Sequence, residues 1–169
     1  MAGSLKRVAD AVVGLLETGE AAGTFSKAIL TERRWLFLKD LEDLDGISVQ
    51  VVPIGSMRER QSNTTFERYV RCDVLCKRRV PQSEISDSGI GREWIDDHVA
   101  ILEEIDDYLG DDGTATRDPE TGLEYVEPGD KRAPREILSK LGIEFFEEAL
   151  IENMFFGVVR VAYRVQGAY

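Results

Sequence analysis

A chain of 169 residues with 43% hydrophobic and 31% charged side chains has the size and composition of one globular domain, which excludes disordered, collagen-like and disulfide-scaffold proteins. Its 32 acidic and 21 basic side chains give a formal charge of −11, which opposes binding of DNA, RNA or anionic lipid through the overall field. No run approaches the roughly 18 apolar residues of a membrane span, and Asp10 breaks the stretch after Lys6 and Arg7, so we expect a soluble cytosolic protein without a secretory signal.

The first half of the chain predicts a helix followed by three strands. Apolar residues recur at helical spacing from Ser4 to Thr18, and Gly19 is expected to follow the helix end in the left-handed conformation. Alternating or β-branched stretches predict strands over 28–39, 47–51 and 66–80. Pro53 and Gly55 are expected to limit the second of them. The short connections favour a meander of successive antiparallel strands.

The second half of the chain predicts helices and one final strand. A loop over 81–91 leads into an apolar stripe at helical spacing, which ends at Gly110 and consists of Ile95, Val99, Leu102, Ile105 and Leu109. Residues 111–132 are expected to be an irregular acidic excursion, followed by short helices over 135–141 and 145–153 and a strand over 155–165. The sequence therefore predicts one α+β domain over 1–169. It has an antiparallel sheet of about four strands with helices on one face, in the order α-β-β-β-α-(α)-β.

Few residues carry a chemical signal, and we expect no catalytic, cofactor-binding or metal site. His98 is the only histidine, and because it has no partner for a metal site we expect it at the surface or on a helix flank. Cys72 and Cys76 lie about 13 Å apart along a strand at ~3.3 Å per residue, too far for a disulfide, so core packing explains them. The carboxylates between Asp96 and Asp107 are expected to form a solvated helix face rather than a catalytic pair.

Two basic clusters at predicted strand ends or connections are the candidate contacts for a neighbouring subunit or an acidic partner. They consist of Arg58, Glu59 and Arg60 and of Lys77, Arg78 and Arg79. Ordinary solvated loops are the alternative interpretation. Trp35 and Phe37 alternate on one side of the first predicted strand, where we expect core positions; a partly exposed aromatic there would be a candidate interface anchor.

Four stretches, taken in chain order, carry a family resemblance. They are 30–41, 47–53, 66–74 and 155–165, with the amphipathic helix 94–109 at the expected place between the last two. Together they resemble small virion proteins at the head–tail junction of tailed bacteriophages, especially the tail-terminator (tail-completion) group. The resemblance covers most of the chain except residues 111–150, which are longer and more acidic than expected for the group.

The resemblance implies a structural virion protein rather than an enzyme. Its subunits would form a ring, usually hexameric, that caps the finished tail tube and joins it to the head connector, in the neck of the virion after assembly in the host cytoplasm. A closed ring requires two different patches on each subunit. DNA would pass through the ring without specific binding, because an acidic wall repels phosphates.

Other functions stay open at this point. A head-closure or adaptor protein would share the location in the neck but contact different neighbours. From a different class, an acidic inhibitor or interaction module would imitate the charge of nucleic acid and concentrate its carboxylates on one surface. An enzyme would need converging carboxylates in a pocket.

Overall fold

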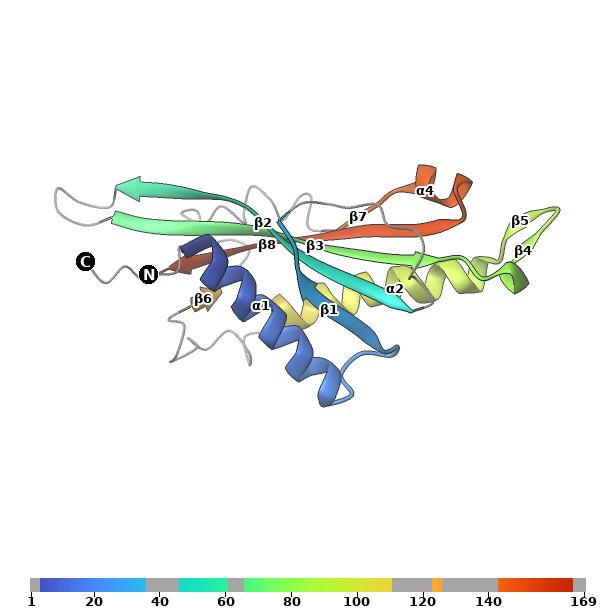
Figure 1. The fold of residues 1–169 in the computed structure, drawn as a ribbon, viewed down its shortest axis with the longest axis horizontal. Coiled ribbons are helices and arrows are strands. Elements are labelled where there is room, and N and C mark those ends of the chain that lie inside the picture. Colours follow the sequence, from blue (N-terminus) through green and yellow to red (C-terminus); the bar gives the residue numbers. More distant parts are fainter. Residues whose placement is uncertain (1–3, 36–45, 61–65, 111–122, 126–142, 166–169) are drawn as a thin grey trace.

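The structure, a computed structural model, describes residues 4–35, 46–60, 66–110, 123–125 and 143–165 of the chain. Figure 1 shows two long helices beside a sheet of long strands. The elements in chain order are α1 (Ser4–Ala21), β1 (Ile29–Arg33), β2 (Ile47–Arg60), β3 (Phe66–Arg79), a short 3-10 helix (Gln82–Glu84), β4 (Ile85–Ser86), β5 (Gly89–Ile90), α2 (Arg92–Gly110), β6 (Leu123–Tyr125), β7 (Ile143–Phe145), α4 (Glu147–Ile151) and β8 (Met154–Val165). The predicted α+β fold class is confirmed.

The described strands form a six-stranded sheet and a separate hairpin of β4 and β5. Strands β1, β2, β3 and β8 lie side by side in that order, and β6 and β7 both pair with the other edge of β8. The pairs β2–β3 and β3–β8 are antiparallel, as predicted. The expected antiparallel pairing of the first two strands is wrong, because β1 runs parallel to β2. A parallel pair needs a crossover of about a dozen residues, and residues 34–46 supply that length.

β2 is much longer than its sequence pattern indicates. We expected Pro53 and Gly55 to limit the strand, but the register merely shifts between them, as at a β-bulge, and β2 continues to Arg60. A bulge accommodates the missing N–H of a proline without ending the strand. The residues predicted as a polar connection at 58–60 therefore belong to β2.

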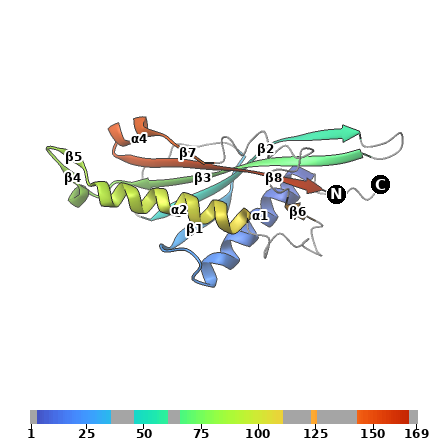
Figure 2. The ribbon, with the colours of Figure 1, turned by 180° about the vertical axis from the view of Figure 1, so that it is seen from behind.

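α1 and α2 cover the same face of the sheet, as predicted, and enclose the main hydrophobic core (Figure 2). Core residues include Val8, Val12 and Leu16 of α1, Ile101, Leu102 and Ile105 of α2, and Val49, Val51, Val70, Val74, Val159 and Val161 of the strands. Cys72 and Cys76 alternate into this core, which confirms their predicted packing role. Gly157 of β8 allows the close approach of α2, because a Cβ at this position would overlap the Leu102 side chain.

The opposite face of the sheet carries a smaller apolar cluster of Val52, Leu75 and Val158, packed against Phe146 and Phe156. The two phenylalanine rings lie 4.8 Å apart between centroids. They connect the short segment around α4 to the sheet, so β7, α4 and β8 form one packed corner of the molecule.

Several predicted boundaries need correction. The first helix continues through Gly19 to Ala21, and Gly23, at φ +69°, has the left-handed conformation instead. Part of the predicted helix 145–153 is strand β7, and α4 is its only helical part in the described residues. The loop 81–91 contains the β4–β5 hairpin. Of the excursion at 111–132, only β6 is described, and the predicted helix 135–141 lies outside the described residues.

Candidate functional site

The two predicted basic clusters lie at opposite ends of the β2–β3 hairpin. Arg58, Glu59 and Arg60 end β2 next to the turn, where their backbones pair with residues 66–68 of β3. Lys77, Arg78 and Arg79 end β3, where they pair with residues 154–156 of β8. The fold therefore does not bring the clusters together into one site.

The cluster at the end of β3 is divided between the interior and the surface. Lys77 is only 1% exposed, so it is buried inside the molecule. Arg78 is half-buried and contacts α2, as described below, whereas Arg79 is exposed. Of these three residues, only Arg79 keeps the surface position that a partner contact needs.

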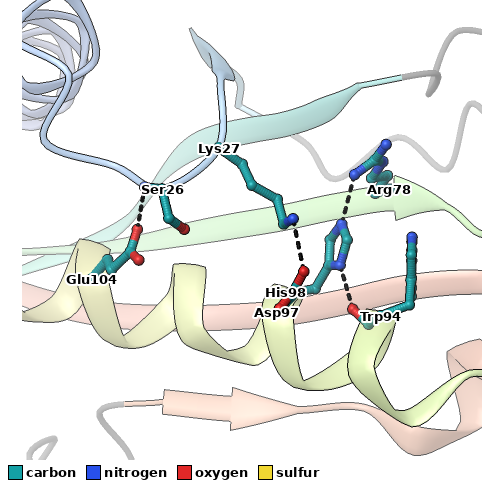
Figure 3. Close-up of polar contacts among 7 residues, drawn as sticks. All are labelled: Ser26, Lys27, Arg78, Trp94, Asp97, His98 and Glu104. Atoms are coloured by element: carbon teal, nitrogen blue, oxygen red, sulfur yellow. Dashed lines mark hydrogen bonds and ion pairs between the residues drawn. The ribbon is translucent and has the colours of Figure 1, made fainter.

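Arg78, His98 and Trp94 form a set of hydrogen-bonded and stacked side chains at the sheet–helix boundary (Figure 3). Arg78 Nη1 lies 2.9 Å from His98 Nε2, and His98 Nδ1 lies 2.6 Å from the Trp94 carbonyl oxygen one helical turn earlier. The Trp94 and His98 rings are stacked with centroids 3.9 Å apart, and the Arg78 guanidinium lies 5.8 Å from the Trp94 ring centroid. This arrangement joins β3 to the first turns of α2.

The partners of His98 determine its protonation state. A carbonyl oxygen only accepts hydrogen bonds, so Nδ1–H donates to Trp94 and Nε2 accepts from the Arg78 guanidinium. The imidazole is therefore neutral. Burial lowers the pKa of His98, the positive charges of Arg78 and Lys27 lower it further, and the Trp94 carbonyl and Asp97 oppose this effect.

The expected surface position of His98 is wrong, because the side chain is 1% exposed. The signal for burial was present in the helical spacing: His98 follows Trp94 by four residues and precedes Ile101 by three, and all three are buried. Leu102, Ile105 and Leu109 are buried as predicted, but the first turns of α2 bury Trp94 and His98, whereas Ile95 and Val99 are only partly buried. His98 is enclosed by packing partners, so we interpret it as a structural residue rather than a general base.

Two further polar contacts fasten the segment after α1 to α2 (Figure 3). Lys27 Nζ lies 2.9 Å from Asp97 Oδ2, and the Ser26 backbone N–H donates to Glu104 Oε2 at 2.8 Å. The Lys27–Asp97 pair is partly exposed and contributes up to about 1 kcal/mol at most. Two of the carboxylates predicted to be solvated therefore have structural partners.

The other titratable groups of the sheet also have structural surroundings. Burial raises the pKa of both Cys72 and Cys76 to about 12, so neither thiol is a thiolate nucleophile at neutral pH. Asp73 lies beside Arg160, which also binds Glu144 of β7 at 2.7 Å. Burial raises the pKa of Asp73, and Arg160 and Arg71 partly offset this effect.

An unpaired sheet edge is the main exposed feature. β1 pairs with β2 as far as Val51, where the Arg34 N–H makes the last bond, 3.0 Å from the Val51 carbonyl oxygen. Beyond this bond, no strand of the described ranges pairs with the outer edge of β2. We call the outer edge of β1 and of residues 52–60, together with Trp35, the open edge. Its exposed apolar side chains are Leu30, Trp35, Ile54 and Met57.

Trp35 is 54% exposed, with the Arg33 guanidinium 5.3 Å from its ring centroid. The core position expected for it is therefore wrong, and it meets the stated condition for a candidate interface anchor. Phe37, its predicted companion, lies outside the described residues.

Within the described ranges, no group of three or more His, Cys, Asp or Glu side chains has the arrangement of a metal site. The described helices include none that is both long and apolar enough to cross a membrane. In comparisons with known proteins, no family model and no curated protein matches this chain.

Proposed function

We propose that this protein is a structural component of the head–tail junction of a tailed bacteriophage, specifically a tail terminator. In this role, identical copies form a ring, usually of six, that caps the tail tube, joins it to the head connector and leaves a channel for DNA. The proposal includes no catalytic step and no cofactor. It extends the resemblance of the sequence to that group of virion proteins.

The open edge is the observation that supports this proposal most directly. Soluble monomers usually protect a sheet edge with charges, bulges or covering elements, and this edge has a register shift near Pro53 and charged residues at 58–60. It nevertheless leaves backbone positions without a partner strand among the described residues, next to the exposed apolar side chains of Trp35, Ile54 and Met57. The other edge of the sheet differs, because β6 and β7 occupy it. Two different edges are what a ring subunit needs for a heterologous contact.

The charge of α2 is consistent with a channel through which DNA passes without binding. Exposed carboxylates on this helix include Glu93, Asp96, Asp97, Glu103 and Asp107. A wall with these groups would repel phosphates and would not hold the DNA.

The test is electron microscopy of the purified protein mixed with tail tubes that lack a terminator. We expect a ring at one end of each tube and tubes of fixed length, and native mass measurement gives the number of copies. Binding only to the head connector would indicate a head-closure or adaptor protein instead. A monomer that binds neither structure contradicts the proposal and favours the acidic interaction module.

A further inference from the structure

One contact encloses the long connection between β3 and α2. Arg78 lies near the end of β3, and Trp94 and His98 lie in the first turns of α2, so their contacts hold both ends of residues 79–93 (Figure 3). Figures 1 and 2 show the β4–β5 hairpin of this connection at one end of the longest axis of the molecule. The hydrogen bond from Arg78 Nη1 to His98 Nε2, 2.9 Å long, joins the two sides. The attachment of this part of α2 to β3 therefore depends on the state of one imidazole.

The two halves of α2 are held in place differently. In the first half, residues 92–100, the buried side chains are Trp94 and His98, whereas Ile95 and Val99 are only partly buried. The second half contributes four side chains to the main core, namely Ile101, Leu102, Ile105 and Leu109. Local opening begins where an element has the fewest buried contacts. Loss of the Arg78–His98 contact should therefore loosen the first half of α2 and leave the second half packed.

The contact requires a neutral imidazole. His98 Nε2 accepts the Arg78 N–H through its lone pair, while Nδ1–H donates to the Trp94 carbonyl oxygen. A proton taken up from water forms an N–H bond at Nε2 and uses this lone pair, so the hydrogen bond from Arg78 breaks. Two positive groups would then face each other across the same short distance, which is unfavourable in a buried site.

The surroundings of His98 do not compensate for this additional charge. Burial lowers the pKa of His98 most, and Arg78 of β3 and Lys27 of the segment after α1 lower it further. The hydrogen bond to the Trp94 carbonyl and the charge of Asp97 on α2 raise this pKa, but the Asp97 carboxylate is 60% exposed and binds Lys27 at 2.9 Å. β8 presents the uncharged ring of Phe155, 5.3 Å from the imidazole between centroids.

We propose that the Arg78–His98 contact is a pH-sensitive clamp, which is closed while the imidazole is neutral and opens when the imidazole takes up a proton. Opening releases residues 79–93 and the first half of α2 from the end of β3. Histidine is the side chain whose charge ordinarily changes in the mildly acidic range, so the clamp responds to moderate acidification. All its parts lie within one copy of the chain, so this inference does not depend on the proposed ring.

Proton linkage gives the direction and the size of the response. In the open state His98 is exposed to water and has its ordinary pKa of 6.5, whereas its pKa in the closed state is lower. The open population therefore increases as the pH falls below 6.5, by up to ~10-fold per pH unit, until the pKa of the closed state is reached. Between pH 7.5 and pH 5.5 we expect a several-fold increase of at most ~10-fold.

Amide hydrogen exchange followed by NMR tests the clamp. Each exchange rate is divided by the intrinsic rate of an unprotected amide at the same pH. The amides of residues 95–100 should lose several-fold in protection between pH 7.5 and pH 5.5, whereas those of residues 104–109 should not. H98Q is the control, because glutamine does not titrate, and its protection in both halves should be the same at the two pH values. A pH dependence that persists in H98Q, or an equal loss in both halves of α2, would overturn the clamp.

Titration of His98 in the unmodified chain decides the question even if H98Q does not fold. His98 is the only histidine of the sequence, so its ring protons can be followed by NMR without assignment of other histidines. We expect a pKa below 6.5 and, above this pH, the tautomer with the proton on Nδ1. R78M should raise this pKa because it removes the facing positive charge. R79M removes an exposed arginine next to it and should leave the pKa unchanged. A pKa at or above 6.5 in the unmodified chain, or equal effects of R78M and R79M, would contradict the clamp.

Discussion

His98 illustrates how one polar side chain becomes part of a core. Its two ring nitrogens are both satisfied, one by the Trp94 carbonyl and one by the Arg78 guanidinium, while its ring stacks on Trp94. A buried polar group without such partners costs about 1–3 kcal/mol, so this residue stabilises the fold only as part of the set. Its neutral form is essential to the arrangement, because an imidazolium would direct an N–H at Arg78.

The stability of the protein should therefore depend on the protonation of His98. Its pKa in the folded state lies below the ordinary value of 6.5, so the unfolded chain takes up the proton first as the pH falls. The stabilising contribution is complete above pH 6.5 and decreases as the pH falls below this value. We expect H98Q to lower the free energy of unfolding by about 1–3 kcal/mol at pH 8 and by less at pH 5.5.

Urea denaturation of the unmodified chain and of H98Q at several pH values measures this difference. The comparison with H98Q is needed because burial raises the pKa of Asp73. The free energy of unfolding of both proteins therefore also changes with pH through Asp73, in the direction opposite to the effect of His98. That contribution cancels in the difference. A difference in free energy of unfolding between the two proteins that stays constant from pH 8 to pH 5.5 would contradict the assignment of a neutral, buried His98.

At the scale of elements, α1 contains two glycines in different surroundings. A Cβ at Gly14 would meet no atom within 4 Å, whereas a Cβ at Gly19 would lie 2.9 Å from the Tyr108 ring and 3.1 Å from the Phe25 ring. These two rings pack edge to face, and the Tyr108 hydroxyl donates to the Leu15 carbonyl of α1 at 3.0 Å. The lack of a side chain at Gly19 therefore leaves room for the Tyr108 ring of α2 to pack against α1.

Alanine at these two positions should change stability in opposite directions. G14A should raise the free energy of unfolding by up to ~1 kcal/mol, because alanine is the better helix former and the site has space. G19A should lower it by about 1–3 kcal/mol, because the new methyl group displaces packed rings. Thermal denaturation followed by circular dichroism measures both. A stabilising G19A would show that the rings move aside at little cost.

At the scale of the whole molecule, the two edges of the sheet differ. β6 and β7 pair with β8 at one edge, whereas the open edge runs from β1 to the end of β2 at the other. A symmetric dimer would bring the same edge of two copies together, whereas a head-to-tail assembly would bring two different edges together. We expect the exposed apolar side chains of the open edge to be removed from water in the assembled form.

Tryptophan fluorescence provides a test of this expectation. Trp94 is buried at 9% exposure and Trp35 is 54% exposed, so assembly should shift the emission to shorter wavelength mainly through Trp35. The shift should disappear in W35F, whereas Trp94 emission should stay constant. Ring formation without any change in Trp35 emission would place this part of the open edge outside the interface.

The periodicity of the sequence determined α1, α2, β3 and β8 and most of the division of their residues between core and surface, with Trp94, His98 and Ile101 of α2 as exceptions. The alternation that places Cys72 and Cys76 in the core and the helical spacing of Val8, Val12 and Leu16 are local patterns, and they were sufficient because hydrophobic burial follows them directly. The basic residues at 58–60 were also identified from sequence, and their role as contacts stays a prediction.

Only the tertiary structure decided the parallel pairing of β1, the length of β2, the contact of His98 with Arg78 of β3 and the exposure of Trp35. Pairing direction depends on the path of a crossover, and a bulge near Pro53 depends on the partner strand that accommodates it. Whether a tryptophan is covered depends on which elements lie over it. These properties arise from contacts between residues far apart in the chain, so no local pattern of amino acids encodes them.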